Sequence, residues 1–334
     1  MLFNEWSVFE IMLSGLYIVQ SGKDDIMAFK KPQEMFEHAY EHNYAIGAFN
    51  VFSLESMMAV MEAAENTHSP AIIQVSSGAE KYVKNVRAFI KTIREFGKEY
   101  DVPFFIQHDH IKSPDACYKA MDDGFDAIMF DGSALPYEEN TKLTSEIVKA
   151  AREKGIWVEA ELGSIAGFED LVYGANTVYT DPEQALEFIA ATSCDALAIS
   201  VGTAHGGVRA DDYLPLELDL LRTITSSKKG YPFVLHGAAS LPPELITACN
   251  DTGMQVEYLR ICSEDNIRKA AQSGILKANM DVDNFLRFTT AARNTMIAKP
   301  AVYDPRKYLE PARDAFREEV EHKMKNVLMS ADRY

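Results

Sequence analysis

The sequence predicts an α/β fold, a (β/α)₈ barrel with additional helices at its C-terminal end. Short apolar runs alternate with longer stretches of helical periodicity, which is typical of βα units around a parallel sheet. Eight such runs follow one another, and polar residues end most of them. One barrel of this kind uses roughly 250 residues as a single domain, so the 334 residues are enough for one barrel and additional helices. We therefore expect a single barrel domain over residues 27–334, with a C-terminal helical tail.

The eight predicted strands are almost continuously apolar, as expected for strands that are covered on both faces. In chain order they are residues 45–51, 71–76, 102–108, 127–131, 156–162, 196–202, 232–236 and 275–280. Each intervening segment is long enough for a helix and two loops. After the last run, residues 284–298 and 311–329 are predicted to be terminal helices, and the second is a candidate for contact with a partner subunit.

Residues 1–26 are interpreted as an N-terminal extension or a mis-assigned start. They are apolar, but Glu5 and Glu10 and the lack of a basic opening argue against an export signal. Met27 opens the first amphipathic helical pattern. No run reaches the roughly 18 apolar residues of a membrane span. The four cysteines show no close pairing, so neither a disulfide framework nor a CxxC metal site is indicated. We expect a cytoplasmic location.

The charge balance limits the possible partners. Lys and Arg total 33 against 50 Asp and Glu, a net charge of −17. Such a chain offers no basic surface for a nucleic-acid backbone or an anionic membrane. An anionic small molecule must therefore be held locally, by a metal, backbone N–H groups or a few placed cations.

The residues that could bind a metal or act in catalysis lie at the strand ends. Polar and metal-ligating side chains end or closely follow the apolar runs, at Asn50, Ser76, Asp109, His110, Asp131, Glu161, His205, His236, Asn279 and Asp281. In a (β/α)₈ barrel these positions converge at the C-terminal mouth, where active sites lie. For a single Asn, Ser or Asp, an equally good explanation is turn formation or helix capping.

The histidines predict a zinc site at this mouth. His110, His205 and His236 each lie at a predicted strand end beside Gly or Asp. Three imidazoles that leave a coordination position open are typical of catalytic zinc. Asp131 and Glu161, from the two following strands, are expected to hold an alternative metal position or to orient the ligands.

Asp109 and His110 would face opposite sides of a regular strand, so both reach the mouth only if the strand unwinds at its end. His108 is left as a packing or supporting residue.

On these residues the chain resembles the class II, metal-dependent fructose-bisphosphate aldolase family, over residue 27 to the C-terminus. The resemblance lies in GAFNV, QVSSGAEKY, DHIKS, FDGSALPYEEN, VEAELGSIAG, SVGTAHGG, VLHGAAS and KANMDVD, with a closing DPRKYLEPARD typical of a long-form subgroup. It implies reversible cleavage of a ketose phosphate to dihydroxyacetone phosphate and an aldehyde through a zinc-bound enediolate. It also implies a homodimer or homotetramer.

The resemblance assigns roles to individual residues. It implies Zn²⁺ on His110, His205 and His236, with Glu161 and Asp131 at a secondary metal position that could take a second divalent or a monovalent cation. Asp109 would be the acid/base at the substrate hydroxyl, and Glu169 would exchange a proton with the enediolate from a mobile loop. Substrate contacts are expected from Asn50, Ser76, Gly206, Arg209, Gly237, Ser240, Asn279 and Asp281.

Several phosphate contacts of the family are changed in this sequence. Ala239 replaces a serine of the turn after the third histidine, and Val282 replaces a hydroxyl residue of the N-x-D-T/S motif. Phe285 stands where long-form relatives use an arginine on the distal phosphate, and Arg209 replaces a lysine. Backbone N–H groups with Arg209, Lys277, Ser240 or Arg287 could still hold one phosphate. We expect a ketose that carries a single phosphate or another polar tail.

Two other functions remain open at this stage. An inactive paralogue that supports a partner subunit would explain the altered phosphate contacts, but not the complete metal and acid/base set. A zinc-dependent epimerase of a sugar or sugar acid could use the same groups.

Overall fold

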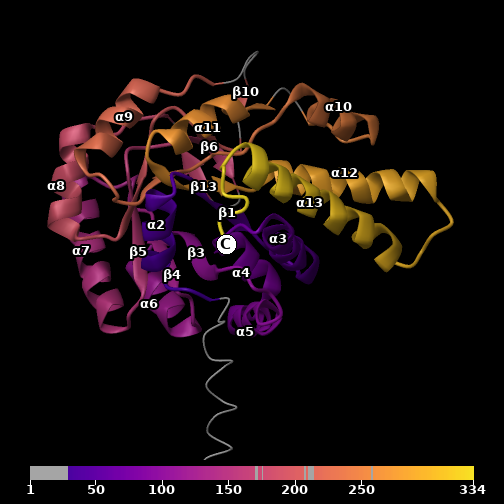
Figure 1. The fold of residues 1–334 in the computed structure, drawn as a ribbon, viewed down its shortest axis with the longest axis horizontal. Helices are drawn as coiled ribbons and strands as arrows, with labels where there is room; N and C mark the ends of the chain where they lie inside the picture. The colour runs from indigo at the N-terminus through magenta and orange to yellow at the C-terminus, as the bar shows by residue number, and fades with distance from the viewer. Residues whose placement is uncertain (1–28, 170–171, 175, 207, 210–213, 257–258) are drawn as a thin grey trace, which may run out of the picture.

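A computed structural model describes residues 29–169, 172–174, 176–206, 208–209, 214–256 and 259–334. The chain forms a closed barrel of parallel strands with helices packed around it (Figure 1). The order of the strands around the barrel is β1-β13-β11-β8-β5-β4-β3-β2. The predicted (β/α)₈ barrel is therefore confirmed. Residues 1–26, assigned from sequence to an extension, lie outside the described residues.

Each of the eight predicted runs overlaps a barrel strand, although the third strand ends at Ile111 and not at residue 108 as predicted. In chain order these are β1 (Ile46–Asn50), β2 (Ala71–Ser76), β3 (Phe104–Ile111), β4 (Ala127–Phe130), β5 (Trp157–Leu162), β8 (Ala196–Ile199), β11 (Phe233–Leu235) and β13 (Ile275–Met280). Neighbouring strands pair in parallel, and the register sets Ser76 opposite Asp109. The polar ends of the strands therefore meet at one mouth.

Within the described residues, ten helices surround the barrel, and six of them begin after a residue whose side chain caps the helix. The ten helices are α2 (Pro32–Glu41), α3 (Leu54–Thr67), α4 (Ser77–Val83), α5 (Val86–Gly97), α6 (Pro114–Asp123), α7 (Tyr137–Glu153), α8 (Pro182–Thr192), α9 (Leu218–Ser227), α10 (Pro243–Asp251) and α11 (Glu264–Gln272). Ser53 and Ser56 form a capping box at α3, and Asp181 caps α8 just before Pro182. None of the described helices is long and apolar enough to cross a membrane.

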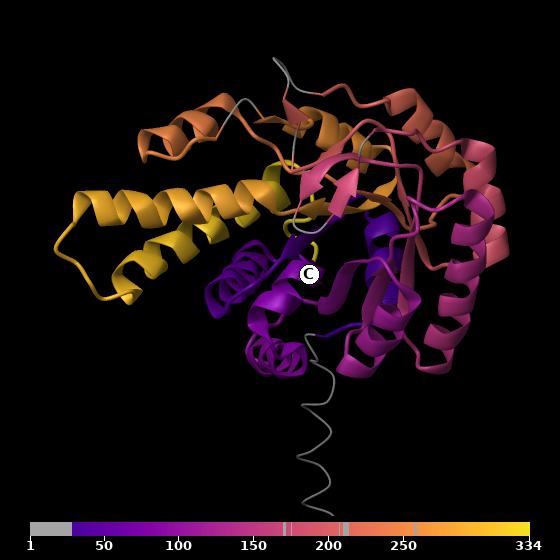
Figure 2. The same ribbon diagram turned by 180° about the vertical axis from the view of Figure 1, so that it is seen from behind.

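Two long C-terminal helices, α12 (Val282–Ala298) and α13 (Arg306–Asn326), pack together and project beyond the barrel in both views (Figures 1 and 2). The predicted start of the second helix at residue 311 is wrong. Pro311 lies inside α13. The helix begins after Pro305, where Asp304 Oδ1 accepts a hydrogen bond from Arg306 N at 3.1 Å. Proline has no backbone N–H, so Pro311 removes one hydrogen bond of the helix without ending it.

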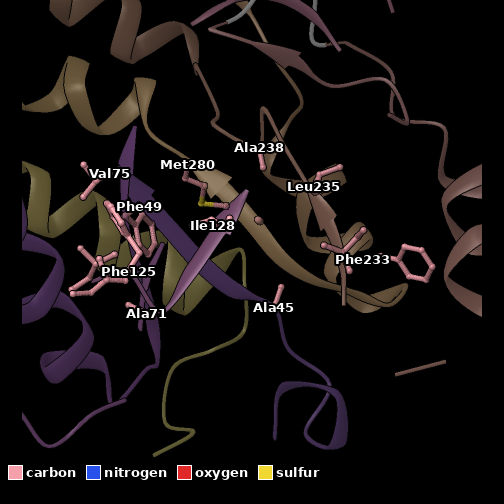
Figure 3. Packing of buried hydrophobic residues seen from close by; sticks show 14 of the residues in the cluster. Ala45, Phe49, Ala71, Val75, Phe125, Ile128, Phe233, Leu235, Ala238 and Met280 are labelled. Atoms are coloured by element: carbon pink, nitrogen blue, oxygen red, sulfur yellow. The ribbon is translucent and has the colours of Figure 1, made fainter. Parts of the chain in front are cut away.

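The core has an outer and an inner part. The outer part lies between the strands and the surrounding helices, and Phe49, Val75 and Met280 belong to it (Figure 3). In the inner part, Met35 and Phe36 of α2 pack against strand residues such as Ile46 and Phe105. Apolar side chains thus fill the N-terminal end of the barrel, and the polar strand residues gather at the other end.

Short strands in the loops complete the mouth. β6 (Ala166–Glu169) pairs with β7 (Val172–Gly174) and β9 (Ala204–His205), and β10 (Val208–Arg209) pairs with β12 (Leu259–Arg260). His205 was expected at the end of a barrel strand, which is wrong in detail. β8 ends at Ile199, and His205 lies in β9, parallel to β6.

Candidate active site

Four buried side chains converge at the C-terminal mouth of the barrel. His110 comes from β3, Glu161 from β5, His205 from β9, and His236 directly follows β11. One potential ligand atom from each residue lies within 4.8 Å of the others. Three imidazoles and a carboxylate form a donor set that suits Zn²⁺ and other divalent transition ions. The structure thus brings together all but Asp131 of the predicted metal-binding residues.

His110 reaches this cluster because β3 changes register near its end. The pairing of β3 with β4 shifts between His108 and Ile111, and His110 has a φ of 44°. This left-handed conformation is uncommon for a residue other than glycine and carries some strain. Because of this irregularity, the side chains of the consecutive residues Asp109 and His110 both reach the mouth of the barrel, as expected for a strand that unwinds at its terminus.

Two of the histidines each use one ring nitrogen for a carboxylate. His110 Nδ1 lies 2.9 Å from Asp131 Oδ2, and His236 Nε2 lies 2.7 Å from Glu159 Oε1. The remaining nitrogens, His110 Nε2 and His236 Nδ1, are 2.8 Å apart. A carboxylate behind the ring is the usual partner of a metal-binding histidine, because it fixes the tautomer and the ring orientation.

The electrostatics of the cluster fit a divalent cation. Glu161 Oε2 is buried and has no hydrogen-bond partner among the described residues. Burial, together with the Asp131 charge, raises the pKa of Glu161 to about 8. Burial lowers the pKa of His236 to about 4. For His110, burial is outweighed by the charges of Asp109, Asp131 and Glu161, and the pKa rises to about 10. A cation would satisfy the lone acceptor and the facing ring nitrogens together.

Asp131 lies beside the cluster with its carboxylate fully engaged. Its Oδ2 accepts hydrogen bonds from His110 and Lys112, and its Oδ1 accepts from Ser133 N and Oγ at 3.1 and 2.6 Å. Although burial opposes ionisation, His110 and Lys112 hold the pKa of Asp131 well below its usual value. In this arrangement Asp131 orients His110.

Asp109 is held by two amides at the inner end of the mouth. Its Oδ1 accepts hydrogen bonds from Gln74 Nε2 and Asn279 Nδ2, each at 3.2 Å. Neither amide partner carries a charge, and the two contacts orient the carboxylate. Gln74 Oε1 is buried and has no partner in the described part of the chain.

A cavity of about 560 Å³ opens beside the cluster. It is lined by Asn50, Val51, Phe52, Ser76, Gly78, Ala79, Tyr82, Gly206, Asp281, Val282 and Phe285. Asn50 Nδ2 donates to Asp281 Oδ2 at 3.3 Å. The cavity therefore includes four of the predicted substrate-binding residues, and its outer wall is aromatic.

The turn after β11 approaches the site through its backbone. Gly237 has a φ of 57°, and a Cβ there would lie 2.5 Å from Ala204 O, so the turn packs tightly against β9. Ala238 N donates to Asn279 O at 3.0 Å, and Ser240 N donates to Asp283 Oδ2 at 3.0 Å. Two of the amides that could have cradled a phosphate are thus already hydrogen-bonded within the chain.

Two cations that the sequence analysis named as possible phosphate contacts form ion pairs with carboxylates. Lys277 is fully buried and donates to Glu159 Oε2 at 2.5 Å. Arg287 Nε donates to Glu319 Oε2 at 2.8 Å. The side chains of two other predicted site residues, Glu169 at the end of β6 and Arg209 at the end of β10, lie outside the described part of the structure.

A layer of polar residues below the mouth is not identified from the sequence, although one of them, Lys277, is named there as a possible phosphate contact. The alternation of side chains along a strand could have identified these residues. Each precedes a predicted site residue by two positions, so its side chain lies on the same side of the strand. They are Gln74 before Ser76, Gln107 before Asp109, Glu159 before Glu161, and Lys277 before Asn279.

Comparisons with known proteins place the chain in a family. The family model described as "Fructose-bisphosphate aldolase class-II" matches residues 30–333. The fructose-bisphosphate aldolase of Treponema pallidum is 38% identical over 321 residues, covering 90% of this chain and 96% of that protein. That of Geobacillus stearothermophilus is 34% identical over 302 residues, with coverages of 90% and 96%.

A solved structure extends the similarity to three dimensions. The YdjI aldolase of Escherichia coli K12 superposes with a TM-score of 0.70 at 27% identity, covering 91% of this chain and 98% of that one. The family match spans almost all the described residues, including every strand of the barrel. The chain therefore belongs to the class II fructose-bisphosphate aldolase family and is an aldolase.

Proposed function

We propose that the chain reversibly cleaves a ketose phosphate to dihydroxyacetone phosphate and an aldehyde, with Zn²⁺ on His110, His205 and His236. The observation that carries this proposal is the convergence of these rings beside the partnerless Glu161 Oε2. The names of the relatives support a ketose phosphate as the substrate class. Bound zinc would supply a Lewis acid that polarises the carbonyl and stabilises the charge left by cleavage. Glu161, with Asp131, is also the candidate site for a second divalent or a monovalent cation.

Asp109 is the proposed acid/base. It would remove the proton from the substrate hydroxyl as the carbon–carbon bond breaks and return it in the synthetic direction. Its two amide contacts support this role because they hold the carboxylate in a fixed position.

Glu169 is proposed for the proton exchange on the other half of the substrate. Its strand β6 pairs with β9, which carries His205, so the two loops are linked. Reversible cleavage needs two proton-transfer groups, because the hydroxyl and the carbanion react at different positions of the substrate.

Substrate binding is proposed along the cavity. Asn50, Asn279 and Asp281 would hold the ketose hydroxyls near the metal. One phosphate would be held by the remaining polar groups, namely Ser76, Gly206, Arg209, Gly237 and Ser240. The aromatic outer wall supports a substrate with a single phosphate, because Phe285 offers no hydrogen-bond donor to a second one.

The test is aldol cleavage before and after metal removal. Chelation should abolish cleavage of ketose phosphates, and Zn²⁺ should restore it. Exchange of the dihydroxyacetone phosphate hydrogens with D₂O, followed by NMR, tests the carbanion half alone. Bound zinc without exchange or cleavage would favour the inactive paralogue. Stereochemical inversion without cleavage would favour the epimerase.

A homodimer or homotetramer and a cytoplasmic location are also proposed. The α12–α13 hairpin projects from the barrel and carries exposed apolar side chains, with Tyr303 at 93% exposure near its end, which supports a protein contact there. All four cysteines are buried free thiols, as is usual in a reducing compartment. Sedimentation analysis would measure the assembly.

A further inference from the structure

A buried ion pair lies directly behind one of the proposed metal ligands. Glu159 and Lys277 are 1% and 0% exposed, and Lys277 Nζ donates to Glu159 Oε2 at 2.5 Å. Gln107 Nε2 donates to the same oxygen at 2.8 Å. The other oxygen, Oε1, lies 2.7 Å from His236 Nε2. One carboxylate oxygen of Glu159 thus contacts the lysine, and the other contacts the histidine.

This arrangement selects one tautomer of His236. An ionised carboxylate only accepts hydrogen bonds, so Nε2 must carry the hydrogen that it donates to Oε1. In the neutral ring Nδ1 is then without a hydrogen, and this nitrogen faces His110 Nε2 at 2.8 Å, inside the cluster. Nδ1 is thereby the nitrogen of His236 that is ready to bind a metal.

The cost of burying two charges argues that the pair does more than add stability. Taking a carboxylate and an ammonium out of water offsets most of their attraction, so a buried pair is often no more stable than apolar residues of similar volume. Partners behind a metal ligand commonly set its orientation and its affinity for the metal.

We infer that Glu159 and Lys277 are positioning residues for the metal centre, in which Lys277 anchors Glu159 and Glu159 holds His236 as its Nε2–H tautomer. This inference rests on the proposed metal site. Lys277 is essential to it because its ammonium occupies Oε2 and leaves Oε1 for the ring.

Glu159→Gln provides the decisive variant. The amide must turn its oxygen toward Lys277 and Gln107, because both are donors, so its NH₂ group then faces His236. The ring can accept that bond only as the Nδ1–H tautomer, which places a hydrogen where the metal should bind. Adding Lys277→Met removes one donor and lets the amide oxygen turn back toward His236.

The matched control is Lys323→Met. Lys323 is also 0% exposed and is paired with Asp283 and Glu319, but it lies on α13 and has no contact with the metal cluster among its described ion pairs. It should lose stability as Lys277→Met does, while its metal affinity stays that of the wild type.

Two measurements on the metal-free protein test the inference. Nitrogen-15 NMR of labelled histidine, assigned with His236→Asn, reads the tautomer directly. We expect Nε2–H in the wild type and in Lys323→Met, Nδ1–H in Glu159→Gln, and a return to Nε2–H in the double variant. Chelator competition should show zinc bound about 10- to 100-fold more weakly by Glu159→Gln and by Lys277→Met. Thermal unfolding verifies that each variant is folded.

An unchanged tautomer in Glu159→Gln, or zinc affinity within twofold of the wild type in both single variants, would overturn the positioning role. If the wild type bound no zinc at all, the proposed function would fail, and the NMR result would still report whether Glu159 sets the tautomer. The two failures are therefore distinguishable.

Discussion

His110 Nε2 and His236 Nδ1 face each other at 2.8 Å, although each ring gives its other nitrogen to a carboxylate. A hydrogen bond between them needs a proton on one of the two facing nitrogens. A divalent cation would bind both of these nitrogens once that proton had left. Protons and a metal ion therefore compete for these two nitrogens.

Metal binding is expected to release about two protons at pH 7. Without metal, the pKa of His110 is raised to about 10 and that of Glu161 to about 8, so both groups are protonated at pH 7. Both must ionise to bind a cation. Zinc affinity should therefore rise with pH, most steeply below about pH 8, and level off near pH 10. Calorimetry in buffers of different ionisation enthalpy counts the protons. Release of less than one proton at pH 7 would contradict the prediction.

Asp109→Ala is expected to lower turnover by about 10²- to 10⁴-fold, the usual contribution of a general acid/base. Zinc should remain bound, because Asp109 is not among the four residues of the metal cluster. Steady-state cleavage and metal analysis of the same preparation provide the two measurements. Loss of zinc would mean that Asp109 is a ligand.

Phe285→Arg is expected to improve cleavage of fructose 1,6-bisphosphate relative to fructose 1-phosphate. Phe285 lines the outer wall of the cavity and meets the Phe52 ring edge-on at 5.3 Å. An arginine there would add a charge-assisted contact to a second phosphate, worth about 10- to 100-fold in the ratio of kcat/KM. Phe285→Leu, which keeps the wall apolar, should leave the ratio unchanged. The expectation of a single phosphate would be wrong if wild-type protein cleaved the bisphosphate as efficiently as any monophosphate.

The barrel could be predicted because its pattern is local. Each strand is a short apolar run, and each run ends in a polar residue that the chain direction alone assigns to the mouth. The same pattern indicated His110 and His236. It was less accurate for His205, because the apolar run continues past Ile199, where β8 ends, into the loop that forms β9.

The polar layer below the mouth could not be assigned in the same way. Glu159 and Lys277 are separated by 118 residues along the chain, and nothing local states that they pair. A lysine near a strand end also has a simpler interpretation as a phosphate ligand. Only closure of the barrel, with β13 next to β11 and β5 across the interior, brings the two charges together.

Acid stability should depend on Glu264, which joins α11 to α13. Its carboxylate accepts hydrogen bonds from Lys323 Nζ at 2.7 Å and His322 Nε2 at 2.9 Å. Burial alone would raise the pKa of Glu264, but these two partners outweigh it and lower the pKa to about 2. An unfolded glutamate has a pKa of about 4.3, so the contact stabilises the fold above that value and the gain is lost as the pH falls toward 2. His322 adds no pH dependence of stability in this window, because a histidine with a raised pKa is protonated in both the folded and the unfolded state.

Glu264→Gln should therefore lower the free energy of unfolding by about 1–2 kcal/mol at pH 6, after allowance for solvent screening, and change it little at pH 2. Glu95→Gln, in an exposed pair with Lys98, is the control that should change neither value. Denaturant unfolding at pH 2 to 6 measures both, and an equal loss at both ends of this range would show that Glu264 acts through packing alone.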